Sequence, residues 1–248
     1  MKNYHLGREE VYPASSRIWS FKNAEDIVNG VNLRISNMAG GFPFECNGDI
    51  WADSERLYLC GEYSHNTDEH LSIQKELLSA TSGYAAKRFY KAKHKKQVRS
   101  DFITFRMQWM LFCVWAKCQG NADFRNLLLS IPDDAILVEN TSSDNGGTAE
   151  IWGCKNKELT AARTALAKKL RAENSHMKKK DLDLLINVET NKLCDIGEWR
   201  GQNNIGKILM LCRDCLRNAT EPTIDYELLN RSNIHLFGER ITFLIPNN

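Results

Sequence analysis

The sequence lacks a long apolar run. Its densest hydrophobic stretch extends only from Trp109 to Trp115 and is bounded by Arg106 and Lys117, whereas a membrane-spanning helix needs about 20 apolar residues. This stretch predicts a buried helix and no membrane span. The first thirty residues also lack an apolar signal core, and we therefore expect a cytoplasmic protein.

The sequence also lacks the cysteine and histidine spacing of a zinc site. Of the eight cysteines, Cys212 and Cys215 have C-x-x-C spacing. They lie in an apolar helical stretch, and no second Cys or His pair follows at a zinc-finger distance. Cys113 and Cys118 likewise fall in a helical stretch. We expect free, mostly buried thiols, no structural metal and no cofactor.

The sequence also has no large excess of charge of either sign, but many of its lysines and arginines are concentrated in two runs. The formal net charge is +2. A first basic run extends from Lys87 to Arg99, and a second basic run extends from Lys168 to Lys180. Such runs are either solvated helix faces or tracks for phosphate groups, and the sequence leaves both interpretations open. Three aromatic residues accompany the first run; they can stack on bases, but we expect them to pack inward: Tyr84, Phe89 and Tyr90.

What is present predicts an α-rich α+β fold. With 42% hydrophobic and 26% charged residues, the chain has the composition of an ordinary globular protein. We expect a single domain over residues 1–248, with a core at 31–154 and 196–216. A helical insertion is expected at about 155–195, where Ala, Leu and Lys are frequent, and a C-terminal extension at 217–248.

Turn and helix signals divide this domain into elements. Residues 1 to about 50 are expected to be strand-rich, with turns at Asn29-Gly30 and Asn47-Gly48, because Asn-Gly tolerates the positive φ angles of tight hairpins. A long apolar helix is expected after Asp101. Further expected elements are a helix capped at Thr67, another near Tyr84, a shorter helix over 121–130, a buried strand over 135–139, a helix after Gly206 and a terminal hairpin within 234–244.

The segment Trp51-Ala52-Asp53-Ser54-Glu55 carries the carboxylate of greatest interest. Asp53 or Ser54 can cap a helix that begins here, and an acid in the first turn is favoured by the positive helix end. Glu55 has two interpretations. It is either a helix-dipole or capping-box residue on the surface, or a catalytic acid or base in a cleft.

Seven separated motifs follow one another in an order that resembles the YbiA-like NADAR family. The resemblance covers residues 31 to 216, apart from 155–195. The motifs are Ser36-Asn37; Trp51-x-x-Ser54-Glu55; Ala85-x-Lys87-Arg88; Asp123-Phe124-Arg125 with Leu127-Leu128-Leu129; Leu137-Val138-Glu139-x-Thr141; Trp152-Gly153; and Asn203-x-Ile205-Gly206-x-x-Leu209-Met210-x-x-Arg213. The sequence departs from the family in two places. The family often follows its glutamate with an aromatic residue, a glutamine and a lysine, whereas here Leu59, Cys60, Gly61 and Glu62 follow Tyr58; and Glu150 stands where the family often has an aspartate.

The resemblance implies an α-rich domain that binds ADP-ribose-like or phosphoribosyl groups and cleaves N-glycosidic bonds. One branch of the family resembles hydrolases of riboflavin-pathway intermediates. Another resembles enzymes that strip ADP-ribose from guanine in DNA, as antitoxins that oppose DarT-type toxins. The implied partners are therefore ADP-ribosylated DNA or an ADP-ribose-like small molecule, with a DarT-type toxin in the second branch, and no membrane.

The chemistry of this reaction indicates which residues are needed. Breaking the bond between ribose C1 and a base nitrogen develops oxocarbenium character on the sugar, while the leaving nitrogen needs a proton. Glu55 is predicted to be the principal catalytic carboxylate, with Glu150 as the second acid. The predicted substrate-binding residues are Ser36, Asn37, Trp51, Lys87, Arg88, Trp152, Gly153, Asn203 and Gly206.

Several of these binding residues have a simpler structural interpretation. Trp152 either stacks on a base or fills the core. Asn203 and Gly206 belong to a loop that either cradles a diphosphate or caps a helix. Lys87 and Arg88 either neutralise phosphate or form surface ion pairs.

Three functions stay open from the sequence. The first is a hydrolase that acts on ADP-ribosylated guanine in DNA, which the family pattern and the two basic runs favour. The second is an N-glycosidase for a small riboflavin precursor, for which the basic runs are incidental. The third is a non-catalytic ADP-ribose sensor, in which Glu55 merely caps a helix.

Overall fold

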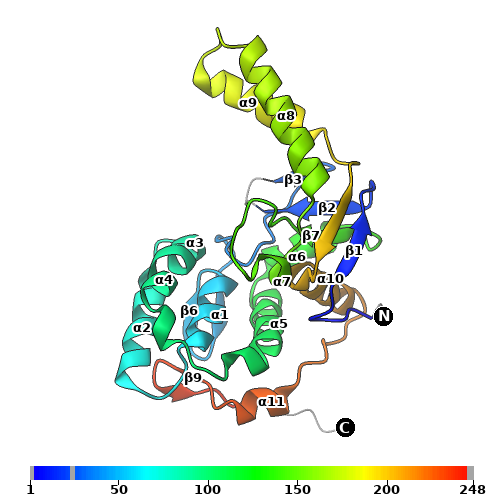
Figure 1. Ribbon diagram of the computed structural model, residues 1–248. Helices are drawn as coiled ribbons and strands as arrows, with labels where there is room; N and C mark the ends of the chain where they lie inside the picture. The colour runs from blue at the N-terminus through cyan, green and yellow to red at the C-terminus, as the bar shows by residue number, and fades with distance from the viewer. Residues whose placement is uncertain (1–2, 23–25, 245–248) are drawn as a thin grey trace. The chain divides into compact units, whose positions relative to one another are not determined.

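The chain has an α+β fold, as the sequence predicts (Figure 1). The structure is a computed structural model that describes residues 3–22 and 26–244. Its sheets, as far as the chain is described, are pairs of strands. The eight cysteines are free thiols. Among the described residues, no helix combines the length and apolar character that crossing a membrane requires.

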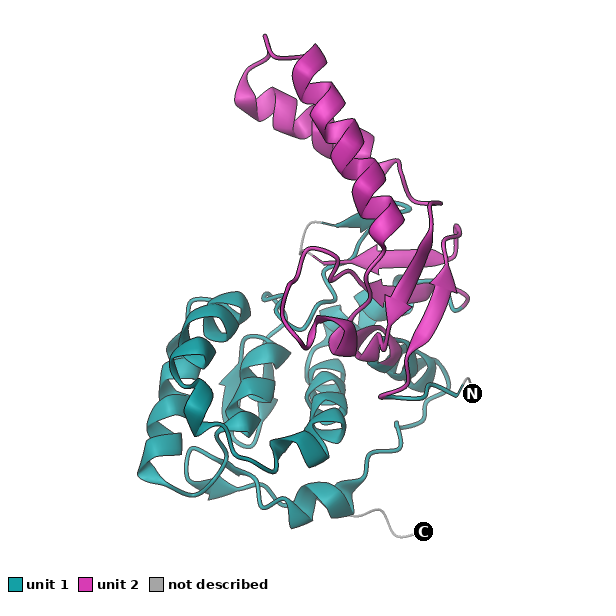
Figure 2. Cartoon of the chain, viewed as in Figure 1, with its two compact units in different colours: residues 1–6, 23–133, 208–248 teal, residues 7–22, 134–207 magenta. Residues whose placement is uncertain are grey.

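Two compact units make up the chain (Figure 2). Unit 1 consists of residues 1–6, 23–133 and 208–248, and unit 2 consists of residues 7–22 and 134–207. The expected insertion at 155–195 lies within unit 2. The single domain expected over 1–248, with its core and C-terminal extension, stays a prediction.

Unit 1 begins with two short hairpins. Strand β3 (Ile27–Val28) pairs antiparallel with β4 (Val31–Asn32), and β5 (Phe44–Cys46) pairs antiparallel with β6 (Asp49–Trp51). At the two turns Asn29 and Asn47 have φ angles of 50° and 55°, and each is followed by a glycine at 80°. Both turns are therefore of the kind that Asn-Gly favours, which confirms the sequence prediction.

The core of unit 1 is helix α1 (Ser54–Glu62) packed on helix α5 (Phe102–Gly120). Every residue of α1 is buried. Gly61 permits this close approach, because a Cβ atom there would lie 2.1 Å from Nε1 of Trp109. The Trp109 N–H donates to the Tyr58 carbonyl over 3.1 Å. The long apolar helix expected after Asp101 is confirmed.

The other elements of unit 1 surround these two helices. Helix α2 (Asp68–Ser79) is capped by Thr67 and packs on α1, and helix α6 (Ala122–Ser130) is capped by Asn121. The single helix expected near Tyr84 is instead a series of short turns. The remaining elements are α3 (Gly83–Ala85), the π-helical turn η1 (Ala86–Tyr90), α4 (Lys91–Lys93), the 3₁₀ turn η2 (Lys95–Gln97), α11 (Tyr226–Arg231) and the expected terminal hairpin of β9 (His235–Leu236) and β10 (Glu239–Arg240).

Unit 2 is built on two strand pairs. Strand β1 (Glu10–Pro13) pairs antiparallel with β8 (Glu198–Gly201), and β2 (Ile18–Phe21) pairs parallel with β7 (Ile136–Glu139). Helix α7 (Ala149–Trp152) packs on β8, and helix α10 (Asn204–Arg217) begins in this unit. The buried side chains at its centre are Val138, Cys154, Leu159 and Trp199.

Helices α8 (Lys157–Glu173) and α9 (Lys179–Asn191) form the expected helical segment. They pack on each other as a hairpin, which is coloured yellow-green in Figure 1. Each helix buries one residue: Leu159 on α8 and Ile186 on α9. Most of the hairpin is therefore surface.

Candidate functional site

Glu55 lies in the first turn of α1 but does not cap it. The cap is Asp53, whose Oδ1 accepts the backbone N–H of Arg56 over 2.9 Å and whose Oδ2 accepts the Arg56 Nε–H over 2.8 Å. Glu55 is 4% exposed. The interpretation of Glu55 as a capping residue on the surface is therefore wrong, and its carboxylate belongs to the small class of buried acids.

Asn37, which follows the buried Ser36, contacts Glu55 at the N-terminus of α1. The Asn37 carbonyl accepts the backbone N–H of Glu55 over 3.2 Å, and the Ser54 hydroxyl lies 3.4 Å from the same carbonyl. The Asn37 side-chain N–H donates to Sδ of Met110 over 2.8 Å. All these polar residues are buried. They satisfy backbone groups that a helix start leaves open, and they hold Glu55 in place.

Lys87 is a charge partner of Glu55. Its Nζ lies 3.6 Å from Glu55 Oε1. The Lys87 side chain is 46% exposed, whereas that of Glu55 is 5% exposed. A buried carboxylate is tolerated when it is paired. The pair therefore lies at the boundary between the core of unit 1 and the solvent.

A second ion pair lies two turns further along α1, and sequence reasoning missed it. Glu62 Oε1 is 2.6 Å from Lys91 Nζ, and the Glu62 side chain is 4% exposed. Its Oε2 is buried and has no hydrogen-bond partner within the described part of the chain. Burial raises the pKa of Glu62, although Lys91 opposes this shift. The available signal was the interval from Glu55 to Glu62, which places both acids on one helix face.

Tyr84, Arg88 and Phe89 form an exposed rim beside Lys87. Tyr84 and Phe89 are 51% and 62% exposed. The Arg88 guanidinium lies 5.6 Å and 5.8 Å from their ring centroids and donates to the Tyr84 hydroxyl. The expectation that these two aromatic residues pack inward is wrong, because α3 and η1 turn them toward solvent. Nucleobases stack on surfaces of this kind.

Trp51, in contrast, belongs to the core. Its side chain is 0% exposed, and its indole N–H donates to the Cys46 carbonyl over 3.1 Å. The ring stacks on Phe237 with the centroids 5.8 Å apart. In this structure Trp51 supports the β5–β6 hairpin and has no surface open to a substrate.

The other predicted residues lie in unit 2. Glu150 is exposed on α7, and Trp152, at the end of this helix, is half-buried. Gly153 is buried, and its carbonyl accepts the backbone N–H of Asn203 over 3.2 Å. A Cβ atom at Gly153 would lie 2.4 Å from the Glu139 carbonyl oxygen. Gly153 therefore allows the chain after α7 to approach β7.

Asn203 holds the start of α10 against β7. Its side chain donates to the Leu137 carbonyl over 2.8 Å and accepts the Glu139 backbone N–H over 3.1 Å. It is 0% exposed and has a φ angle of 50°. A Cβ atom at Gly206 would lie 2.2 Å from the Leu137 carbonyl oxygen. Both residues are thus engaged in packing, and their role in binding a diphosphate stays a prediction.

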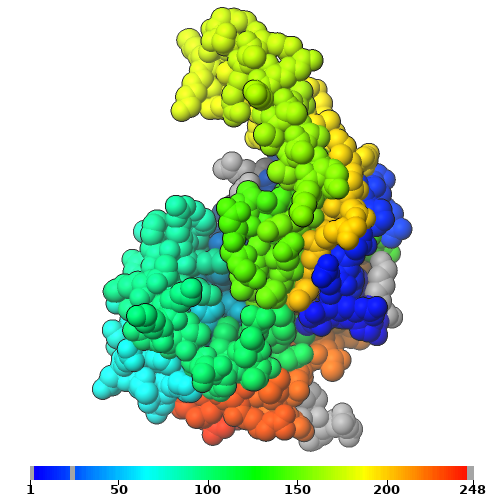
Figure 3. Space-filling model, viewed as in Figure 1, coloured from blue at the N-terminus to red at the C-terminus, as the bar shows by residue number. Residues whose placement is uncertain are grey.

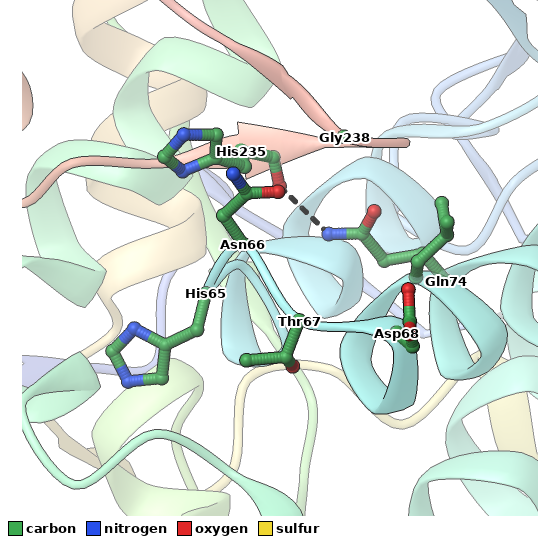
Figure 4. A pocket seen from close by; sticks show the side chains of 8 residues that line it. His65, Asn66, Thr67, Asp68, Gln74, His235 and Gly238 are labelled. Atoms are coloured by element: carbon green, nitrogen blue, oxygen red, sulfur yellow. Dashed lines mark hydrogen bonds between the residues drawn. The ribbon is translucent and has the colours of Figure 1, made fainter.

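A small polar pocket in unit 1 contains none of the predicted site residues (Figure 4). Its lining includes His65, Thr67, Gln74 and His235. The Gln74 side-chain N–H donates to the His235 carbonyl over 2.8 Å. This contact ties the terminal hairpin to α2. The described residues also hold no cluster of His, Cys, Asp and Glu that is suited to a metal ion.

A search of solved structures finds a protein of similar fold, while the other comparisons find nothing. No family model matches the chain, and no curated protein matches it. The NMR structure of the E. coli protein YbiA is similar over 82% of this chain and 86% of that chain, with 23% identity and a TM-score of 0.49. A likeness at this level carries no argument about activity, substrate or residue roles.

Proposed function

We propose that the protein is an N-glycosidase that removes ADP-ribose from modified guanine in DNA. One observation carries the proposal: the buried Glu55 carboxylate is paired with a half-exposed Lys87, beside the exposed rim of Tyr84, Arg88 and Phe89. Buried acids are uncommon outside functional sites and structural ion-pair networks. The motif pattern in the sequence supports the same reaction.

The proposed reaction is a hydrolysis. The bond between ribose C1 and the guanine nitrogen breaks, and C1 forms a bond with the oxygen of a water molecule. Glu55 orients this water, takes its proton and stabilises the positive charge that develops on the ribose. A second acid gives a proton to the leaving guanine nitrogen. Glu150, from the sequence, and Glu62, from its raised pKa, are the candidates for this acid.

The residues around Glu55 suit the rest of the substrate. Tyr84, Phe89 and Arg88 offer planar surfaces for the base. Lys87 and Arg88 supply positive charge for the diphosphate. Because η1 is a π-helical turn, and such turns are frequent at functional sites, its position beside α1 agrees with this assignment.

The test measures released ADP-ribose. The purified protein is incubated with ADP-ribosylated DNA and, separately, with a riboflavin-pathway N-glycoside, and the products are quantified by mass spectrometry. We expect release from the DNA. Glu55→Gln is expected to lower the rate by roughly 10²- to 10⁴-fold, whereas Glu45→Gln, at an exposed residue of β5, should retain the wild-type rate.

The other functions give different results in the same experiment. Cleavage of the riboflavin precursor without cleavage of modified DNA supports the small-molecule N-glycosidase. Binding of ADP-ribose without turnover of either substrate supports the sensor. Hydrolysis of modified DNA by Glu55→Gln at the wild-type rate contradicts the role of Glu55. Pairing with a DarT-type toxin stays a prediction.

A further inference from the structure

The second basic run lies at the turn of the α8–α9 hairpin. Residues 168–180 include the last part of α8, the connection and the start of α9, which we call the hairpin tip. In the space-filling view the hairpin forms a surface of its own at one end of unit 2 (Figure 3). All the cations of the tip are exposed: Lys168, Lys169, Arg171, Lys178, Lys179 and Lys180.

These cations have little compensation from the folded chain. Lys169 lies 3.8 Å from Glu173, a contact between two exposed side chains. None of the other five cations forms an ion pair with a described residue. The nearest further acids in the sequence, Asp181 and Asp183, are exposed on α9. The tip therefore presents a dense positive charge to the solvent, of which Glu173 offsets only a part.

The three lysines at the start of α9 are also unfavourable residues for the N-terminus of a helix. Lys178 occupies the N-cap position of α9, and its ammonium group cannot accept a hydrogen bond from the helix. Lys179 and Lys180 follow at the positive helix end, where cations are disfavoured and only Asp181 is favourable. Residues that are locally unfavourable, with no compensating contact in the folded chain, are expected at functional or strained sites.

The composition of the tip indicates the type of partner. It contains no Phe, Tyr or Trp, so it offers no platform for stacked bases and no aromatic anchor for a protein partner. Flexible lysines suit an array of phosphates, which positions a protein without reading sequence. Two helix ends contribute these lysines, so they can contact several successive phosphates.

We infer that the hairpin tip binds the phosphate backbone of DNA. This inference rests on the proposed function for its choice of DNA as the polyanion. Contact at the tip holds the nucleic acid, while the chemistry belongs to Glu55 in unit 1. Binding at the tip therefore does not require a modified base.

The test uses unmodified, fluorescently labelled duplex DNA and the full chain. The tip variant carries Lys178→Gln, Lys179→Gln and Lys180→Gln. The matched control carries Lys75→Gln, Lys95→Gln and Lys96→Gln, which remove the same charge from three exposed lysines of unit 1. Fluorescence anisotropy gives Kd at several salt concentrations, and circular dichroism verifies that each variant is folded.

We expect the tip variant to bind at least about tenfold more weakly at roughly 0.1 M salt. Its slope of log K against log salt concentration should be smaller by about 2 to 3, since each lost phosphate contact removes about 0.9. The control should retain the wild-type slope. Because the DNA is unmodified, these results do not depend on hydrolysis, and a failure of the proposed activity is seen separately as absent ADP-ribose release.

Three outcomes would overturn the inference. In the first, the tip variant binds with the affinity and salt slope of the wild type. In the second, the control loses as much binding as the tip variant, which means that DNA affinity depends on the total positive charge of the protein and not on the hairpin tip. In the third, the wild-type chain does not bind DNA but sediments with phosphatidylserine vesicles, which assigns the tip to a lipid surface.

Discussion

The two basic runs are alike in sequence and different in structure. In the first run four of the seven lysines and arginines form ion pairs within unit 1, whereas in the second run one of the six, Lys169, forms an ion pair with a described residue. The pairs of the first run are Lys87 with Glu55, Lys91 with Glu62, Lys93 with Glu76, and Arg99 with Asp101. Whether a basic run serves the fold or is available to a partner therefore depends on which carboxylates the folded chain brings next to it.

The largest effect on stability is expected at Lys117 on α5, a fully buried cation of unit 1. Its side chain is fully buried, with Nζ 4.2 Å from the Phe124 ring centroid and a hydrogen bond to the Ala39 carbonyl over 3.3 Å. Burial lowers the pKa of Lys117 from 10.5 to about 8. Between these values the unfolded chain binds more protons than the folded chain, so the free energy of unfolding rises with pH across this window.

The rise that Lys117 contributes should reach about 3 kcal/mol. Lys117→Met should remove it, because methionine has no proton to bind. Urea unfolding below and above the window measures both proteins. A wild-type stability that is as flat as that of the variant would contradict the burial of a charged lysine.

The pairing of the first run is broken most directly at Lys87. Lys87→Ala leaves the buried Glu55 carboxylate without its ammonium partner, which costs about 1–3 kcal/mol of interaction free energy. If this energy is lost in the transition state, kcat should fall by roughly tenfold to a hundredfold. Lys87→Arg should restore part of the rate, and Lys95→Ala is the control on the same run. Steady-state kinetics on ADP-ribosylated DNA measure the effect. An unchanged kcat, together with a smaller slope of log K for DNA against log salt concentration, would instead indicate that Lys87 contributes to DNA binding.

A substitution at Glu62 tests whether burying this carboxylate, the partner of Lys91 in the first run, lowers the stability of the protein. Because its pKa is raised in the folded state, the folded chain binds more protons than the unfolded chain above the ordinary value of 4.5. Stability therefore falls as pH rises through the window between the two pKa values, and the charged form is disfavoured at neutral pH. Glu62→Gln should increase the free energy of unfolding at neutral pH, and this gain should vanish below the unfolded pKa.

Urea unfolding at neutral and acidic pH measures this gain, with Glu69→Gln on the exposed face of α2 as the control. A loss of stability at neutral pH on Glu62→Gln would show that the Lys91 pair outweighs burial. A gain together with lost hydrolysis would instead indicate that the chain retains Glu62 for function at the expense of stability.

The smallest effect is expected for stability at the hairpin tip. Each of Lys178→Gln, Lys179→Gln and Lys180→Gln should change the free energy of unfolding by less than about 0.5 kcal/mol, since these side chains are exposed and unpaired. The combined change should be slightly stabilising, because it removes cations from a positive helix end. Thermal unfolding measures it. A large loss of stability would show that the tip lysines serve the fold, as the first run does.

Local chemistry explains which parts of the fold were predictable. The Asn47-Gly48 turn and the caps at Asp53, Thr67 and Asn121 each depend on a few neighbouring residues. Pairing over long distances was not predictable from periodicity. The parallel pairing of Ile18 with Ile136 is an example, because it depends on the whole of unit 2.

The candidate site shows the same limit. Sequence patterns selected Glu55, and the structure adds that it is buried, a consequence of α1 packing against α5 and α2. The exposure of Tyr84 and Phe89 was not predictable, because it depends on the short turns that replace the expected helix. The packing roles of Trp51, Asn203 and Gly206 follow from contacts with residues far away in sequence.

If the proposals are correct, chemistry at Glu55 and DNA binding at the hairpin tip are separable. Steady-state hydrolysis of an ADP-ribosylated duplex by two variants measures whether they are. Glu55→Gln should lower kcat by roughly 10²- to 10⁴-fold with an unchanged Kd for DNA, and the triple tip variant should retain kcat with a KM raised about tenfold or more. A Glu55→Gln enzyme with wild-type kcat, or a tip variant whose kcat falls while its KM is unchanged, would show that one or both assignments are wrong.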